Sequence, residues 1–445
     1  MLLGGIYPLF RGGIHPPDKK RATKNSEFSN LAIPRLVYIS VQQHIGEPAK
    51  PIVNPGDTVE EGNLIAIGET RVSANIHSPV TGRVVEIAEY PSANGVSQTI
   101  VIELHGSFTP QSKRELVRTI ETVNKSEISE IVKNAGVVGL GGAAFPAHIK
   151  LLPPASVKIH TIIMNGAECE PYLTVDDMLM KTYPDAIIDG IRLVMKSLDV
   201  ENVIIGIEDN KPKAIKAMKD AASAFKEITV KPLKSRFPQG AEKQLLLSTL
   251  GKEIPSRGLP MDLGAVVFNV GTAFAIREAV LYDKPLTERY ITVSGDCIKN
   301  PGNYKVKIGT RIADIIEECG GLKKDPAKII LGGPMCGISV DTAEVSVIKG
   351  TSGIVVLSKS EIDVKEYGPC LRCGKCVAVC PIGLLPSEIA NAAEVWRYDV
   401  AEKLFPFECI SCGSCSYICP AKRPISHFIK VAGAEIRKKI NITVK

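Results

Sequence analysis

The sequence predicts a multidomain α/β protein, and three observations support this fold class. The first part of the chain carries short β-strand patterns broken by Gly, Pro and Asn, and the middle part alternates apolar strands with helical stretches. Near the C-terminus, eight of the twelve cysteines fall in two copies of one spacing. At 445 residues, length alone suggests about three domains. From the patterns we divide the chain into four units, at residues 1–115, 116–285, 286–360 and 361–445.

The composition excludes several classes of protein. A hydrophobic content of 44% with 23% charged residues is typical of a soluble globular protein. No uninterrupted apolar run reaches the roughly 18 residues that a membrane-spanning helix needs, so any role at a membrane is expected to be peripheral. The first residues lack the basic and long apolar segments of a secretory signal. Cysteines that bind metal must stay reduced until loaded, which favours the cytosol.

The first unit is predicted to be β-rich. The turn at 55–62 leads into an apolar strand at 64–67, and residues 77–87 repeat this arrangement. The repeat resembles the barrel-sandwich fold of lipoyl and biotinyl carriers. Those carriers present a Lys between the two halves, whereas residues 69–75 contain none, so no swinging prosthetic arm is expected. Residues 11–18, upstream of the repeat within this unit, are expected to form an extended lead.

The second unit is predicted to contain a largely parallel sheet. Residues 160–164 and 202–207 are apolar runs bounded by turn residues, which is typical of buried strands. Helical stretches at 186–196, 212–224 and 241–249 alternate with them. In such sheets ligands bind at the carboxyl ends of the strands, so residues that follow these strands are candidate site residues.

The third unit is predicted to be a small β-grasp domain. Residues 290–295 have a strand pattern and residues 312–319 a helical one. Gly320 and Gly321 are expected to end that helix in the left-handed conformation. A later turn is expected at 332–335.

Two copies of C-x2-C-x2-C-x3-C-P dominate the fourth unit, and this is the ligand spacing of ferredoxins with two [4Fe–4S] clusters. In that arrangement the fourth cysteine of each run binds the other cluster. The spacing therefore predicts one cluster on Cys370, Cys373, Cys376 and Cys419, and a second on Cys409, Cys412, Cys415 and Cys380. Two structural zinc sites are the alternative, but zinc does not account for the third cysteine and the proline of each run.

The segment between the two runs and the tail after them are predicted to be helical. The helical pattern at 387–404 favours an α-helical ferredoxin over a compact βαβ one. The tail from 420 to 445 is strongly basic and has apolar residues at helical spacing. We interpret it as a closing helix with a solvated basic face, or as a surface for an acidic partner or an anionic membrane. Nucleic acid is not expected as a partner, because the tail lacks aromatic residues for base stacking. The other cysteines are expected to be buried thiols: Cys169, Cys297, Cys319 and Cys336.

A glycine-rich loop at 136–146 is the second informative stretch. Glycines let backbone N–H groups approach a phosphate closely, yet the loop fits neither a nucleotide-hydrolase P-loop nor a Rossmann fingerprint. Lys150 follows it, and the stretch 165–171 places an amide and two carboxylates after a predicted strand. Pyridine nucleotides give up two electrons as hydride, while each cluster carries one. The sequence therefore predicts a flavin between them.

A known family shares these stretches. The loop with Lys150, the stretches 165–171 and 240–245, and residues 269–272 resemble, in order, the FMN/NADH site of the flavin-carrying subunit of respiratory complex I. The resemblance implies non-covalent FMN and NAD(H), with no catalytic residue beyond the flavin site. The implied cofactor-binding residues are Gly139, Gly141, Gly142, Ala143, Phe145, Lys150, Asn165, Glu168, Glu170 and Glu242.

The resemblance also implies roles within this set. The loop backbone and Lys150 are expected to hold the FMN phosphate, and Asn165 and Glu168 to lie on the flavin side. Phe145 and Glu170 are expected to contact the bound nicotinamide nucleotide. The chain departs from the complex I pattern at three positions, with Leu140 in place of Arg, Ala167 in place of Asp and Pro153 in place of an aromatic residue.

The order of all four units resembles the RnfC family of the Rnf ion-translocating ferredoxin:NAD oxidoreductases, including the lead at 12–17 and an SLBB-type (soluble-ligand-binding) β-grasp unit. This resemblance implies a peripheral electron-transfer subunit on the cytoplasmic side of the cell membrane. Its implied partners are an iron–sulfur subunit that receives electrons from ferredoxin and integral membrane subunits that move Na⁺ or H⁺. Two alternatives remain: a soluble flavin/iron–sulfur cobalamin reductase, whose units come in a different order, and a non-enzymatic cluster scaffold.

Overall fold

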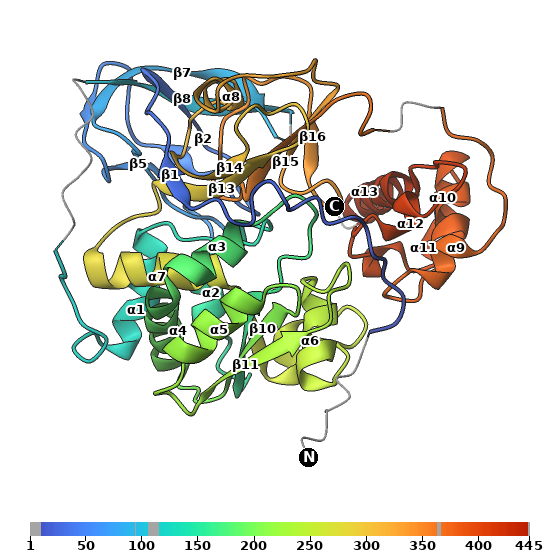
Figure 1. The fold of residues 1–445 in the computed structure, drawn as a ribbon, viewed down its shortest axis with the longest axis horizontal. Helices are drawn as coiled ribbons and strands as arrows, with labels where there is room; N and C mark the ends of the chain where they lie inside the picture. The colour runs from blue at the N-terminus through green and yellow to red at the C-terminus, as the bar shows by residue number, and fades with distance from the viewer. Residues whose placement is uncertain (1–9, 94, 106–114, 363–365, 444–445) are drawn as a thin grey trace.

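The computed structural model describes residues 10–93, 95–105, 115–362 and 366–443. In Figure 1 the strands of the first and third units form an upper layer, the α/β unit lies beneath them, and the cysteine-rich helices stand to one side. The start of the described chain, in dark blue, passes along the helical module and then between the two layers. The lead thus lies against three of the four units.

The first unit consists of two small antiparallel sheets, with strand orders β2-β8-β7-β4 and β3-β5-β6. Val37, Ile39, Ile65 and Ile102 are fully buried in the core that the sheets enclose. This confirms the predicted barrel-sandwich fold. The strands are β2 (Leu36–Ser40), β3 (Lys50–Pro51), β4 (Thr58–Val59), β5 (Leu64–Ile67), β6 (Ile76–His77), β7 (Gly82–Ser92) and β8 (Gly95–Leu104).

The second unit has a four-stranded parallel sheet of order β11-β10-β9-β12, as predicted. Alternate residues of β9 face opposite cores: Ile162 and Met164 pack in one, and Ile163 packs with Leu245 and Leu246 in the other. The elements are α1 (Lys125–Asn134), α2 (Ala147–Leu151), β9 (Thr161–Gly166), α3 (Val175–Thr182), α4 (Pro184–Leu198), β10 (Val203–Glu208), α5 (Pro212–Ala221), β11 (Ile228–Leu233), α6 (Glu242–Leu250), η1 (Pro260–Leu263), β12 (Ala265–Asn269) and α7 (Val270–Tyr282).

The third unit is a six-stranded sheet of order β1-β14-β13-β17-β15-β16 with helix α8. Strand β1 follows the lead in sequence and pairs in parallel with β14, which the sequence did not predict. Gly320 and Gly321 have φ values of 83° and 84°, so they end α8 in the expected left-handed conformation. The elements are β1 (Phe28–Asn30), β13 (Glu288–Ser294), β14 (Gly302–Lys307), α8 (Ile312–Glu318), β15 (Lys328–Leu331), β16 (Ile338–Val340) and β17 (Gly353–Leu357).

The fourth unit is helical, as predicted, but the expected single stretch at 387–404 is two helices. Trp396 has a φ of 55°, and this left-handed residue breaks the helix between α10 and α11. The last helix packs against both of them. The elements are α9 (Lys375–Ala378), α10 (Pro386–Glu394), α11 (Tyr398–Glu402), η2 (Pro406–Glu408), α12 (Ser414–Tyr417) and α13 (Ile425–Thr443). Among the helices that the structure describes, none has both the length and the apolar character to cross a membrane.

Candidate functional site

Two cavities in the helical unit bring the eight motif cysteines together in two sets of four. The outer cavity, of about 250 Å³, is lined by Cys370, Cys373, Cys376 and Cys419. Cys373 is exposed, Cys370 and Cys419 are half-buried, and Cys376 is buried. Three of these cysteines belong to the first motif and one to the second, as the ligand spacing requires.

The inner cavity, of about 20 Å³, is lined by Cys380, Cys409, Cys412 and Cys415. Cys409 is half-buried and the other three are buried. Burial raises the pKa of the Cys415 thiol to about 12, so a thiolate there needs a cationic partner such as iron. The donor set therefore fits an iron–sulfur cluster.

Short helices explain why each motif splits between the cavities. Each third cysteine lies in a four-residue helix, α9 or α12, that follows a left-handed glycine, and the fourth cysteine lies past its end. The proline after the fourth cysteine prevents the helix from continuing. In the described part of the chain, no three His, Cys, Asp or Glu side chains converge on a site for a single metal ion. Each set of four cysteines instead lines a cavity of its own, in the combination that the crossed ligand sets predict.

The glycine loop presents an exposed tip that carries no large side chain. The loop is closed by a hydrogen bond of 2.7 Å from Gly139 N to Phe145 O. Gly141, Gly142 and Ala143 at the tip are exposed. Gly142 has a φ of 106°, and a Cβ built on it meets nothing within 4 Å. The backbone at the tip is therefore accessible to a ligand.

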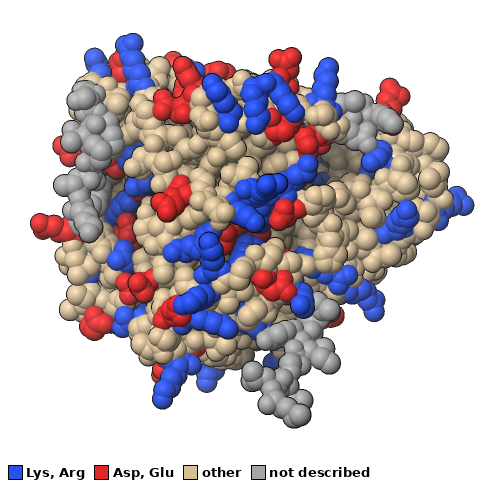
Figure 2. Space-filling view, viewed as in Figure 1, with Lys and Arg blue, Asp and Glu red and all other residues tan. Residues whose placement is uncertain are grey.

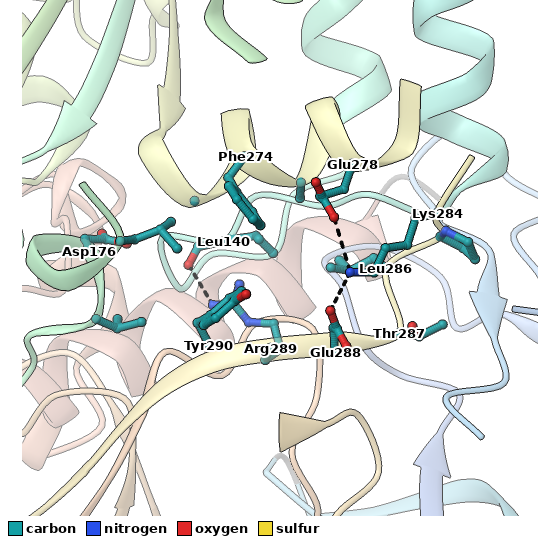
Figure 3. Close-up of a pocket in the computed structure, with 15 residues that line it drawn as sticks. Leu140, Asp176, Phe274, Glu278, Lys284, Leu286, Thr287, Glu288, Arg289 and Tyr290 are labelled. Carbon is teal, nitrogen blue, oxygen red and sulfur yellow. Dashed lines mark hydrogen bonds and ion pairs between the residues drawn. The ribbon is translucent and has the colours of Figure 1, made fainter. Parts of the chain in front are cut away.

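Two residues outside the predicted set, Thr272 and Arg289, hold the glycine loop in place through hydrogen bonds to Leu140. Thr272 Oγ1 accepts the Leu140 N–H at 2.9 Å. The buried Arg289 donates to Leu140 O at 3.2 Å and to Thr351 O at 3.0 Å, and Figure 3 shows it beside a cavity of about 40 Å³. Burial lowers the pKa of this guanidinium to about 10. Arg289 comes from β13 of the third unit, so no local pattern could have revealed its role.

Lys150, Phe145 and Glu242 are brought together beside the loop. Lys150 Nζ donates to Val267 O at 2.8 Å and lies 3.6 Å from Glu242 Oε2. The same ammonium lies 5.9 Å from the centroids of the Phe145 and Phe268 rings. These contacts join α2, the start of α6 and the end of β12. Residues far apart in sequence are thereby brought together on one side of the glycine loop.

Asn165 and Asn269 lie side by side at the ends of β9 and β12. Asn165 Nδ2 donates to Gly240 O at 2.8 Å. Asn269 Nδ2 donates to Asp176 Oδ2 at 2.7 Å, and its Oδ1 accepts Gly271 N–H and caps α7. Asp176 was not predicted, because it reaches the site only through this long-range contact.

The Glu168 carboxylate points to the start of α3. It accepts the N–H of Asp176 at 2.6 Å and of Asp177 at 3.3 Å, as a capping group does. Burial raises the pKa of this carboxyl to about 8, although Lys20 lies 3.8 Å away and opposes the shift. Glu168 itself has a φ of 47°, so the turn after β9 is left-handed there.

The Glu170 carboxylate points to the hairpin between β15 and β16. It accepts Met335 N–H at 3.0 Å and Cys336 N–H at 2.8 Å, and burial raises its pKa. Gly333 is required beneath it, because a Cβ there would lie 2.3 Å from Glu170 Oε2. Glu170 thus joins the end of β9 to the third unit.

The same hairpin touches the loop around the inner cavity. A Cβ on Gly413 would lie 2.8 Å from Met335 O. Cys412, Met335 and Cys169 belong to one small apolar cluster with Ile14 and Phe237. The inner cavity therefore faces the carboxyl end of the parallel sheet. Of the cysteines outside the motifs, Cys297 and Cys319 are buried as expected, whereas Cys169 is half-buried and Cys336 is exposed.

Comparison with known proteins adds domain assignments to this geometry. The RnfC barrel sandwich hybrid domain matches residues 9–107, and the FMN-binding domain of Nuo51 matches residues 132–278. The SLBB domain matches residues 290–339, and a 4Fe-4S dicluster domain matches residues 362–420. These matches confirm the predicted fold class and the predicted FMN and two [4Fe–4S] clusters.

Several relatives match over most of their length. The C component of a proton-translocating ferredoxin:NAD(+) oxidoreductase complex from Clostridium ljungdahlii is 45% identical, over 96% of this chain and 94% of the relative. The corresponding component of a Na(+)-translocating complex from Acetobacterium woodii is 43% identical, over 97% of each chain. That of an ion-translocating oxidoreductase complex from Rhodobacter capsulatus is 42% identical, over 86% of this chain and 75% of the relative.

Proposed function

This chain belongs to the RnfC family of Rnf complex components, and from this premise we propose that it passes electrons between two [4Fe–4S] clusters, FMN and NAD(H). The observation that carries the proposal is the pair of four-cysteine cavities, of which the inner one faces the flavin domain. FMN, when bound, exchanges two electrons with the nicotinamide as hydride and exchanges single electrons with clusters. The protein binds the clusters, FMN and the nicotinamide in this order and shields them from water.

The glycine loop fits a phosphate-bearing flavin. We assign the phosphate to the backbone at Gly141, Gly142 and Ala143, whose exposed tip has room for it, with the cation of Lys150 nearby. Gly139 is proposed to support this tip, because its N–H closes the loop on Phe145 O. Arg289 adds a buried cation beneath the loop. Two positive side chains and several N–H groups together balance a phosphate dianion.

The remaining site residues divide into those proposed to contact the flavin and those proposed to contact the nicotinamide nucleotide. We assign Asn165 and Glu168 to the flavin side and Phe145, Glu170 and Glu242 to the nicotinamide nucleotide. To contact a nucleotide, the Glu170 carboxylate must give up its hydrogen bonds with the N–H groups of Met335 and Cys336 in the hairpin. Glu242 is half-exposed beside Lys150, so it is already accessible.

The positions of the cavities give an order of electron transfer. The inner cavity adjoins the end of β9, so its cluster is proposed to exchange electrons with FMN. The outer cavity has the exposed Cys373, and the side chains of Leu371 and Leu385 beside it are 63% and 45% exposed. Exposed apolar residues around a redox centre suit a partner surface, and we propose that an iron–sulfur subunit supplied by ferredoxin docks there.

We further propose that the chain lies at the cytoplasmic side of the cell membrane, as a peripheral subunit of a multi-subunit complex. The names of its relatives differ in the transported ion, proton in one and Na⁺ in another, although both relatives match this chain over more than 90% of their length. We therefore assign ion movement to integral membrane partners. Purifying the native complex and identifying its subunits tests this, because a soluble cobalamin reductase would have no membrane partners.

A matched pair of glycine variants tests the flavin site. Gly142 and Gly95 have φ values of 106° and 110°, and neither has an atom within 4 Å of a built Cβ. Gly142→Val is expected to weaken FMN binding by about 10- to 100-fold, because a branched side chain displaces one hydrogen bond to the charged phosphate, worth about 1.5–3 kcal/mol. Gly95→Val carries the same backbone strain at a distant hairpin and should bind FMN normally.

The readouts are FMN content after anaerobic reconstitution, bleaching of the flavin absorbance by NADH, and NADH:viologen activity. Wild type and Gly95→Val should show all three. Wild-type protein that binds no FMN, or binds it without bleaching, would refute the proposal. Unchanged activity in Gly142→Val would support the non-enzymatic scaffold instead.

A further inference from the structure

The lead at residues 10–20, here called the strap, runs across the boundary between the helical unit and the flavin domain. Figure 1 shows it in dark blue beside the cysteine-rich helices and then between the two layers. Its outward side chains include the exposed Lys19, and the exposed Arg21 and Lys24 follow it in sequence. Figure 2 shows basic residues gathered near the middle of this face of the molecule. Lys20, in contrast, is buried. The strap therefore has an inner face that contacts both domains.

Near its N-terminal end the strap contacts the loop that carries Cys380, one of the cysteines lining the inner cavity. Gly13 N donates to Val379 O at 2.9 Å, directly before Cys380. Gly12 has a φ of 69°, and a Cβ built on it would lie 2.7 Å from the carbonyl oxygens of both Val379 and Cys380. Only glycine allows this approach, because the obstructing atoms are backbone.

In its middle the strap is paired with the flavin domain. Ile14 and Phe237 exchange two backbone hydrogen bonds, of 2.8 and 2.9 Å. Both side chains pack with Cys412 of the inner cavity. The guanidinium of Arg236 lies 5.4 Å from the Phe10 ring and donates to Phe10 O at 3.2 Å. One short segment thus connects the two domains where the inner cavity meets the sheet.

At its second end the strap holds the turn after β9. Lys20 Nζ donates to Glu168 O at 2.6 Å, and Lys211 Nζ donates to Ala167 O at 2.7 Å. Only 7% of Lys20 and 5% of Lys211 is exposed. Two buried ammonium groups from distant segments thus fix adjacent carbonyl groups of a turn that contains a left-handed glutamate. Such a turn persists only when its surroundings hold it.

We infer that the strap is a positioning element, with Gly12 and Lys20 as its positioning residues, that fixes the inner cavity relative to the turn at 165–170 of the flavin site. The inference rests on the proposed function, because that turn forms one wall of the flavin site. Electron transfer between the inner cluster and the flavin requires a fixed separation, and neither domain's own core supplies it. The strap does, because it bonds to both sides within eleven residues.

Gly12→Ala tests the first contact, since the added methyl group forces the strap away from Val379 and Cys380. Gly321→Ala is the matched control, because Gly321 has a φ of 84° and no atom within 4 Å of a built Cβ. Stopped-flow absorbance after mixing with NADH separates flavin reduction from cluster reduction. In Gly12→Ala, cluster reduction should slow severalfold, because the rate of electron tunnelling falls exponentially as the separation between the two redox centres grows. Flavin content and flavin reduction should stay within about twofold of wild type.

Hydrogen exchange of the reconstituted and the cofactor-free protein gives a readout independent of activity. The amides of Gly13, Ile14 and Phe237 should exchange faster in Gly12→Ala and stay protected in Gly321→Ala. Lys20→Met tests the second contact and should slow cluster reduction, whereas Lys20→Arg, which keeps a donor and a charge, should restore part of the rate. Recovery by the conservative variant is not expected of a residue that only fills space.

The outcomes separate this inference from the proposed function. Wild-type protein without FMN, or without bleaching by NADH, refutes the proposed function and the inference that rests on it. Normal flavin reduction in every variant, with unchanged cluster reduction and unchanged exchange, overturns the strap alone. A parallel loss of FMN, clusters and thermal stability in Gly12→Ala and Lys20→Met also overturns it, because it would show a general structural role.

Discussion

Replacing Glu408 should loosen the helical unit from the flavin domain. Glu408 lies at the end of η2, directly before Cys409, and reaches across the domain boundary. Its carboxylate accepts hydrogen bonds from Lys243 Nζ at 2.8 Å, Ser256 Oγ at 2.6 Å and Arg257 N at 2.9 Å. Glu408→Gln keeps the shape of the side chain and removes its charge, so it isolates the electrostatic part of this contact.

The size of the effect follows from the pKa of Glu408. The hydrogen bond from Lys243, with those from Ser256 and Arg257, lowers this pKa from 4.5 to about 2. At about 1.36 kcal/mol per pKa unit this corresponds to roughly 3 kcal/mol, which we reduce to about 2 kcal/mol for partial solvent screening. Because the folded pKa is the lower one, the stabilisation is complete above pH 4.5 and is lost as the pH falls toward 2.

Hydrogen exchange of the Arg257 amide measures the opening of this boundary. At neutral pH, Glu408→Gln should speed its exchange by about thirtyfold, the equivalent of about 2 kcal/mol. The difference from wild type should shrink as the pH falls from 4.5 toward 2, because the carboxylate then takes up a proton in the opened state before it does so in the closed one. The exposed Glu402 of the same unit is the control, and Glu402→Gln should exchange like wild type. Equal exchange in Glu408→Gln and wild type at neutral pH would refute the reasoning.

Two further changes test other parts of the structure. Cys380→Ala should lose the cluster of the inner cavity and about half of the iron, and its EPR spectrum should match that of Cys412→Ala; a match to Cys373→Ala would disprove the crossed ligand sets. Lys349 is fully buried and donates to two backbone carbonyls, and burial lowers its pKa from 10.5 to about 7. The folded protein releases this proton before the unfolded chain does, so the stability of wild type relative to Lys349→Met should rise by about 1 kcal/mol per pH unit above pH 7. Thermal unfolding midpoints measured over that range check this, and parallel pH curves for the two proteins would contradict it.

Features that depend on local pattern could be predicted from the sequence. The apolar runs at 160–164 and 202–207 are strands because β-branched residues bounded by turn residues favour a buried parallel sheet. The cysteine spacing predicted which cysteines meet, because the short helix that contains each third cysteine directs the fourth cysteine away from the other three. The glycine loop could also be recognised from the sequence, because its conformation requires residues without large side chains.

Features that depend on long-range contacts could not be predicted. The break at Trp396 has no Gly or Pro to mark it, and the left-handed residue is held by the packing of α10 and α11. Arg289 reaches the glycine loop from another domain, and β1 joins a sheet whose neighbouring strand is far away in sequence. The motif in the lead was recognisable, but its contacts with Cys380 and Glu168 exist only once all the domains have packed together.

The contacts between domains are concentrated around the inner cavity, and this has a consequence for how the protein works. Glycines of the strap and the hairpin at Met335 lie against segments that carry its cysteines. Glu408, directly before Cys409, bonds to Lys243 of the flavin domain. The outer cavity instead presents Cys373 and apolar side chains to solvent. A partner that binds at the outer cavity can therefore arrive, shift or leave without changing the separation between the inner cluster and the flavin. In this arrangement the distance between the inner cluster and the flavin is fixed within the protein, whereas the distance between the outer cluster and the partner can vary.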